Sequence, residues 1–205
     1  MRYGMLIDLS KCIGCAACVM ACKVENGTLT GVYWCNVYTK EIGKYPRVKK
    51  RTMPSACMHC TNAPCVKACP TGASYHTEEG LVLVDYDKCI GCRVCLNACP
   101  YNARHYNFTD QRKNPYYEGM EMTPFEKVKN KNHPIGKAGK CILCKDRLND
   151  GKKPACVQTC PTQCRIFGDL DEPNSEVSIA IRNNGAKPLY AHLGTKPSVY
   201  YIGSI

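Results

Sequence analysis

Large apolar side chains are scarce in this chain of 205 residues. It has three phenylalanines and one tryptophan, and Leu, Ile, Val and Phe together number 38, a little under a fifth of the sequence. Combined with a net charge of +11, that share would ordinarily predict a disordered chain. The length also excludes a large multidomain enzyme. Something other than aliphatic packing must therefore hold this fold together.

Long apolar runs are absent too. The longest, 15–22, is far shorter than the roughly 18 residues that a membrane-spanning helix needs, so we expect no direct membrane span. Residues 1–8 look like a short strand. They lack the basic head, apolar middle and cleavage site of a signal peptide, and we expect no export signal in this sequence.

Familiar catalytic motifs are also lacking. The sequence shows no Ser-His-Asp set, no phosphate-binding G-x-x-x-x-G-K loop and no H-E-x-x-H. His59, His76 and His105 lie within or after cysteine runs, but enough cysteines are present to make histidine ligands unnecessary. We interpret them as residues that tune a metal centre or face solvent. No catalytic centre is expected in this chain.

Cysteine, in contrast, is abundant, with 18 residues. Sixteen of them form four runs. Run one is C-x2-C-x2-C-x3-C at 12–22, run two is C-x2-C-x4-C-x3-C-P at 57–70, run three is C-x2-C-x2-C-x3-C-P at 89–100, and run four is C-x2-C-x11-C-x3-C-P at 141–161. Disulfides are disfavoured, because a disulfide scaffold joins cysteines that are spread over distant loops, whereas these cysteines are only three residues apart.

Zinc and iron-sulfur clusters remain as alternatives for these runs. Zinc accepts two C-x2-C pairs, so a third cysteine at the same interval would be surplus. An iron-sulfur cube uses that triplet, and in the bacterial ferredoxin run the fourth cysteine binds the other cluster of a pair. Four runs therefore predict four [4Fe-4S] clusters in two pairs.

The basic charge fits the same interpretation. Each oxidised cube with its four thiolates carries about −2, so four cubes would offset about 8 of the positive charges. The excess of Lys and Arg is then compensation for anionic clusters rather than a nucleic-acid footprint. We expect no nucleic-acid partner.

Short strands and helices surround the runs. The patterns predict strands at 3–8, 32–42, 48–53, 81–85, 165–168 and 199–202, and helices at 18–25 and 176–183. Strand 81–85 leads into Lys-Cys-Ile-Gly-Cys just as strand 3–8 does, so the chain repeats internally. Residues 110–139 have no clear period and predict a long surface insertion that packs on a partner or remains mobile. Residues after Cys164 are expected to lie along the cluster body.

Two cysteines fall outside the runs. Cys164 follows Cys160 at the offset that Ala73 and Ala103 occupy after runs two and three, and Cys35 lies beside Trp34. We interpret both as compact buried hydrophobic residues without a metal to bind.

The order of the four runs resembles the iron-sulfur subunit of the dimethyl sulfoxide reductase family of molybdenum or tungsten enzymes. The segments Cys57-Met58-His59-Cys60, Cys69-Pro70-Thr71-Gly72-Ala73 and Gly151-Lys152-Lys153-Pro154-Ala155-Cys156 are similar to those of the family, and the similarity covers nearly the whole chain. The resemblance implies a nested pairing of run one with run four and of run two with run three. The implied ligands are Cys12, Cys15, Cys18 and Cys160 for cluster 1; Cys22, Cys141, Cys144 and Cys156 for cluster 2; Cys57, Cys60, Cys65 and Cys99 for cluster 3; and Cys69, Cys89, Cys92 and Cys95 for cluster 4.

The resemblance also implies the architecture and the partners. We expect an α+β fold of two interleaved bacterial-ferredoxin-like units with short strands, short helices and long loops. The outer unit is 1–52 with 140–205, the inner unit is 53–109, and 110–139 is an insertion loop. The chain would pass single electrons to or from a large molybdopterin-containing catalytic subunit, without being an enzyme on its own. Cluster 1 would mark the end nearest that subunit.

Several partners, compartments and functions are compatible with the sequence. A membrane anchor subunit, or a quinol or cytochrome donor, is compatible with the resemblance. So are the cytoplasm and an extracytoplasmic site reached by co-export with a signal-bearing partner. A free-standing polyferredoxin, or a hydrogenase-type electron carrier, is the alternative function, and a zinc-bound interaction protein is the alternative from another class.

Overall fold

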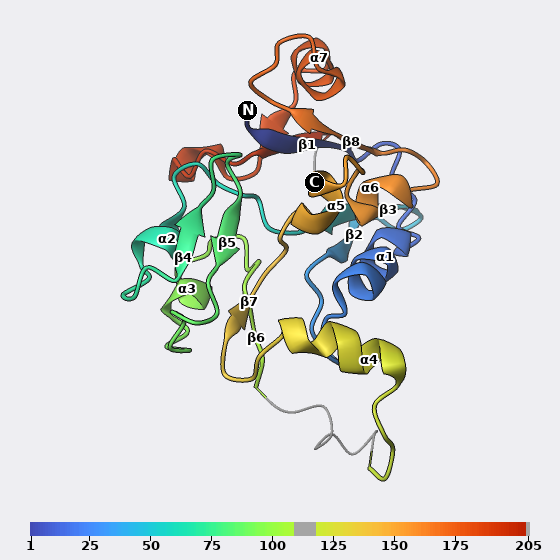
Figure 1. Cartoon of the computed structure of the whole chain (residues 1–205). Coiled ribbons are helices and arrows are strands. Elements are labelled where there is room, and N and C mark those ends of the chain that lie inside the picture. The colour runs from blue at the N-terminus through green and yellow to red at the C-terminus, as the bar shows by residue number, and fades with distance from the viewer. Residues whose placement is uncertain (109–117, 204–205) are drawn as a thin grey trace.

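A four-stranded sheet brings together the first strand and three late ones (Figure 1). In the computed structural model, which describes residues 1–108 and 118–203, the strand order is β8-β1-β10-β9. The strands are β1 (Tyr3–Asp8), β8 (Arg165–Asp169), β9 (Lys187–Pro188) and β10 (Val199–Ile202). Strand β1 runs parallel to β10 and antiparallel to β8. Its run of consecutive apolar residues suits a central strand that is covered on both faces.

Helix α7 (Glu176–Asn183) packs on this sheet against β1 and β8. Ser175 caps it, because its hydroxyl accepts a hydrogen bond from the backbone N–H of Ser178 at 3.2 Å. Val177 is fully buried, and a Cβ at Gly168 would lie only 3.1 Å from it. The bounds of α7, β1 and β10 are those that the sequence predicted, which confirms these three elements.

Three hairpins contain the remaining strands. β2 (Asn36–Lys44) pairs with β3 (Arg47–Ser55), β4 (Ser74–His76) with β5 (Val82–Val84), and β6 (His105–Tyr106) with β7 (Ala138–Gly139). The prediction of a strand from residue 32 was wrong at its start. The N–H of Val32 bonds the carbonyl of Leu29 in a turn, and Trp34 and Cys35 are then buried in a separate apolar cluster before β2 begins.

Most helices are short and lie within or just after the cysteine runs. They are α1 (Ala17–Asn26), α2 (Pro64–Lys67), α3 (Val94–Asn97), α5 (Lys145–Asn149) and α6 (Ala155–Gln158). Helix α1 packs against α6, and α2 packs against α3. Figure 1 shows α2, α3 and the β4/β5 hairpin on one side of the molecule and α1, α5 and α6 on the other.

The described part of the expected insertion has structure of its own. It holds α4 (Pro124–Lys129), the 3-10 turn η3 (Asn130–Asn132) and β7. Lys129 Nζ donates to the carbonyl of Glu25 at 2.7 Å, and His133 Nε2 lies 2.6 Å from the carbonyl oxygen of Asn26. The segment is therefore fastened to the end of α1. Residues 110–117 of the insertion lie outside the described residues.

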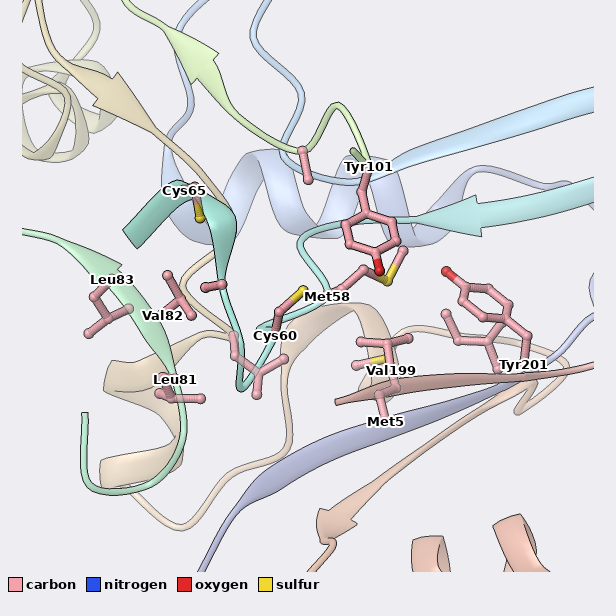
Figure 2. Packing of buried hydrophobic residues seen from close by; sticks show 14 of the residues in the cluster. Met5, Met58, Cys60, Cys65, Leu81, Val82, Leu83, Tyr101, Val199 and Tyr201 are labelled. Carbon is pink, nitrogen blue, oxygen red and sulfur yellow. The ribbon is translucent and has the colours of Figure 1, made fainter. Parts of the chain in front are cut away.

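Sulfur is part of the main apolar core. One cluster joins residues of the sheet, such as Met5 and Tyr201, with Val82 of the β4/β5 hairpin and with cysteines such as Cys60 and Cys65. Figure 2 shows these side chains converging from separate elements. A small 3-10 turn, η4 (Ala191–Leu193), precedes β10. No helix in the described residues is long and apolar enough to cross a membrane.

Candidate iron-sulfur centres

One small cavity is surrounded by three cysteines of run two and the last cysteine of run three. Cys57, Cys60, Cys65 and Cys99 line it together with Arg104. Burial, together with the neighbouring thiols of Cys57, Cys65 and Cys99, raises the pKa of Cys60 to about 12. The structure thus brings cysteines of run two and run three to one cavity.

A second cavity gathers the last cysteine of run two and three of run three. It is lined by Cys69, Cys89, Cys92 and Cys95, with Ala138 of β7. Burial raises the pKa of Cys95, and the thiols of Cys89 and Cys69 contribute to the shift. Cys92 is exposed, so this group lies close to the surface.

A third group forms where α1 meets α6. Burial is the main reason that the pKa of Cys22 lies far above its usual range. The neighbouring thiols of Cys141, Cys156 and Cys144 raise it as well. The amide of Asn26 donates to Cys22 Sγ at 3.5 Å. Cys22 belongs to run one and its three neighbours to run four, so residues far apart in sequence come together here.

The fourth group, like the second, includes an exposed cysteine. Cys156 faces Cys18 and Cys160, and Cys164 faces Cys160 and Cys12. These contacts bring the cysteines of run one to the last cysteine of run four. Cys15, between Cys12 and Cys18 in the loop, is exposed.

The two cysteines outside the runs are buried, as predicted, but they do more than fill space. Cys35 hydrogen-bonds Cys18, which lowers the pKa of Cys18 to about 6. Cys164 Sγ lies 3.5 Å from Cys160 Sγ. Burial opposes the ionisation of Cys160, yet hydrogen bonds from Thr162 and Cys164 leave its pKa lowered. Sequence reasoning missed these contacts, although the four-residue offset of Cys164 from Cys160 signals proximity.

The three histidines differ in environment. His59 is buried, and its Nδ1 accepts a hydrogen bond from the backbone N–H of Val82 at 3.1 Å. Burial holds the pKa of His59 well below its usual range, so the ring is neutral. His76 is exposed and His105 is half-buried. Sequence reasoning did not separate His59 from the other two.

Buried basic residues also escaped the sequence analysis. Arg104, Lys140 and Arg165 are each at most 4% exposed. Arg104 Nη2 donates to Cys65 Sγ at 3.0 Å, and Arg165 Nη1 lies 3.8 Å from Cys156 Sγ. The surplus of basic residues in the sequence thus includes side chains placed directly against cysteine sulfur.

The donor groups fit iron-sulfur cubes. Each group brings together thiols from two runs, and burial raises the pKa of several of them, such as Cys22, Cys60 and Cys156, which favours the thiol until a cation replaces its proton. Within the described residues, no three His, Cys, Asp or Glu side chains lie as close as the ligands of a single ion would. That spacing does not conflict with a cube, whose thiolates surround four irons rather than one.

Comparisons with known proteins agree with this chemistry. One family described as a 4Fe-4S dicluster domain matches residues 48–113 and 107–170, and a second with the same description matches residues 11–73. The three matches and the 18 cysteines fit four [4Fe-4S] clusters.

Similar proteins are subunits of reductases and of a dehydrogenase. The chain is 39% identical to the arsenate respiratory reductase iron-sulfur subunit ArrB of a Shewanella species, over 100% of this chain and 97% of that protein. It is 43% identical to a selenate reductase subunit of Mesobacillus selenatarsenatis, over 98% and 72%. It is 41% identical to a sulfite dehydrogenase subunit of Allochromatium vinosum, over 98% and 82%. The chain therefore belongs to the iron-sulfur, electron-transfer subunits of the dimethyl sulfoxide reductase family.

Proposed function

We propose that this chain conducts single electrons along a row of four clusters, between a large molybdopterin-containing catalytic subunit and an external donor or acceptor. The sixteen cysteines of the four runs hold the clusters in the nested sets that the resemblance implies. When bound there, each cube supplies a site that gains or loses one electron. The chain's own residues fix the order of the clusters, their spacing and their surroundings.

The order of the row is the observation that carries this proposal. Each set has at least one cysteine that lies within electrostatic range of a cysteine in the next set. Cys156 of cluster 2 faces Cys18 of cluster 1, Cys141 of cluster 2 faces Cys57 of cluster 3, and Cys65 of cluster 3 faces Cys95 of cluster 4. These electrostatic interactions between neighbouring sets support a single path from cluster 1 to cluster 4.

Two interleaved ferredoxin-like units accommodate this path. The inner unit, 53–109, would hold clusters 3 and 4, and the outer unit, 1–52 with 140–205, clusters 1 and 2. The packing of α2 on α3 and of α1 on α6 supports the division, because each helix pair joins the two runs that share ligands. Residues 110–139 would form an insertion whose described part rests on α1.

The two ends of the row are suited to meet partners. Cys15 in cluster 1 and Cys92 in cluster 4 are exposed, and beside them Ile13 and Ile90 are 67% and 68% exposed. We place the catalytic subunit at the cluster 1 end. The substrate is decided there, as the selenate, arsenate and sulfite named for the relatives illustrate.

The proposal is tested by metal analysis of the anaerobically prepared full chain. We expect brown protein with about sixteen iron and sixteen acid-labile sulfide per chain, as four cubes require. Replacement of Cys99 by alanine should remove the signal of one cluster in electron paramagnetic resonance (EPR), whereas replacement of Cys35 should remove none. Colourless protein with stoichiometric zinc would contradict the proposal.

Copurification tests the partner separately. A tightly held molybdopterin protein supports a subunit of a larger complex. A free chain that exchanges electrons with several unrelated redox proteins supports a polyferredoxin instead.

A further inference from the structure

Three buried cations lack a carboxylate partner in the described part of the chain. Arg104 and Arg165 are each 4% exposed and Lys140 is 1% exposed. None of them takes part in the ion pairs found among the described residues. An uncompensated charge is costly to bury, so each of these side chains requires an anionic neighbour of another kind.

Arg104 is placed between clusters 3 and 4 of the proposed row. Its Nη2 donates to Cys65 Sγ at 3.0 Å and its Nη1 to Ser74 Oγ at 2.9 Å. It also faces the sulfurs of Cys57 and Cys95. Cys57 and Cys65 are assigned to cluster 3 and Cys95 to cluster 4, so one guanidinium donates to a ligand of cluster 3 and lies within electrostatic range of a ligand of cluster 4.

Arg165 occupies the matching place between clusters 1 and 2. Its Nη1 lies 3.8 Å from Cys156 Sγ, its Nη2 lies 3.5 Å from Cys35 Sγ, and it faces Cys18 as well. Arg104 and Arg165 each follow the last cysteine of their run by five residues. The Nε of each is buried without a hydrogen-bond partner in the protein. The internal repeat has therefore put the same group in the same setting twice.

Lys140 lies at the remaining gap, between clusters 2 and 3. Its Nζ donates to the carbonyls of Cys141 and Val82. Cys141 is assigned to cluster 2 and faces Cys57 of cluster 3. The N–H of Val82 in turn donates to His59, which follows Cys57 by two residues.

We propose that Arg165, Lys140 and Arg104 form a row of fixed positive charges, one in each gap between successive clusters, that raises the reduction potentials of the clusters beside it. This inference rests on the proposed assignment of the clusters. A cube becomes more negative by one charge on reduction, and a nearby buried cation stabilises that form more than the oxidised one. Because the charges alternate with the clusters, all four potentials are shifted in the same direction.

A purely structural role makes a different prediction. Arg104 links Cys65 to Ser74 and could simply brace the loop, in which case losing its charge would affect cluster retention and leave the potentials unchanged. The potential is therefore the measurement that separates the two roles.

The test compares the full chain, prepared anaerobically, with Arg104→Gln, Arg104→Lys and the exposed control Arg47→Gln. Iron is counted first, and the midpoint potentials are then measured by redox titration followed by EPR. For Arg104→Gln we expect the potentials of two of the four clusters to fall, each by at least about tenfold in the equilibrium constant for reduction, or about 59 mV for one electron. Arg104→Lys should recover most of that shift, and Arg47→Gln should cause none.

Each outcome decides the matter. Unchanged potentials in Arg104→Gln with full iron overturn the inference, as does an equal shift in Arg104→Lys. If Arg104→Gln loses iron, Arg104→Lys decides, because a charge requirement predicts recovery of iron and potential whereas a shape requirement predicts neither. Fewer than four clusters in the unaltered chain would instead refute the proposed function.

Discussion

Gly91 allows the loop of run three to pass the β6/β7 hairpin, and replacing it with alanine should disrupt cluster 4. The residue has a φ of +72°, and a Cβ there would lie 2.2 Å from the carbonyl oxygen of Gly136 and 3.0 Å from Tyr106 Oη. Left-handed backbone costs a non-glycine residue about 1–2 kcal/mol. Relieving the contact requires the backbone to move by roughly 1 Å, and such overpacking adds about 1–3 kcal/mol.

The matched control is Gly72→Ala. Gly72 has a φ of +66° and also follows a ligand cysteine, but a Cβ there would meet nothing within 4 Å. It should show the backbone strain alone, which corresponds to a melting temperature lower by about 2–8 °C in a domain of this size.

Iron content and EPR distinguish the two variants. We expect Gly91→Ala to lose about a quarter of the iron, as one cube of four, and Gly72→Ala to keep all of it. Full iron and four unchanged signals in Gly91→Ala would refute the reasoning, because the loop would then accept a side chain that the structure leaves no room for.

Three further predictions follow from the contacts described above. Cys35→Ala should keep all four clusters but lower the potential of one, because a hydrogen bond to a ligand sulfur stabilises the reduced form; a redox titration checks this, with Cys164→Ala expected to act in the same direction. Lys23→Met should lower the free energy of unfolding by about 1.5–3 kcal/mol in anaerobic denaturant titrations, because its ammonium donates to the carbonyls of Thr28, Leu29 and Val32; the exposed Lys40→Met should change little. Removal of iron by a chelator should abolish most of the circular dichroism signal, since clusters replace much of the apolar core; retained structure would contradict this.

Several elements of the fold could be predicted from the sequence for a physical reason. Strand β1, helix α7 and strand β10 were predicted because their apolar spacing and caps are local properties of the chain. The family could be recognised because binding an iron-sulfur cluster requires a strict spacing of cysteines in the sequence. Both kinds of signal depend on neighbours in sequence.

What the sequence did not reveal depends on contacts between distant segments. The short helix α4 has no clear period, and a local signal, the capping box of Thr123 and Glu126, was overlooked. Lys129 and His133 hold this helix against the end of α1. The burial of Arg104 and Arg165 could not be read from a sequence in which basic residues usually face water. The hydrogen bond from Cys35 to Cys18 likewise joins a hairpin entry to a helix.

The central place of β1 in its sheet bears on how the protein is made. Strand β1 leaves the ribosome long before its partners β8 and β10. Until they emerge, both edges of β1 are open to pairing with another chain, which is a route to aggregation. The β4/β5 hairpin and the helix pair α2 and α3 have no such wait, because they pair with one another within residues 64–97. The β4/β5 hairpin and the α2/α3 pair should therefore form before the four-stranded sheet does, and a bound chaperone would be most valuable at β1.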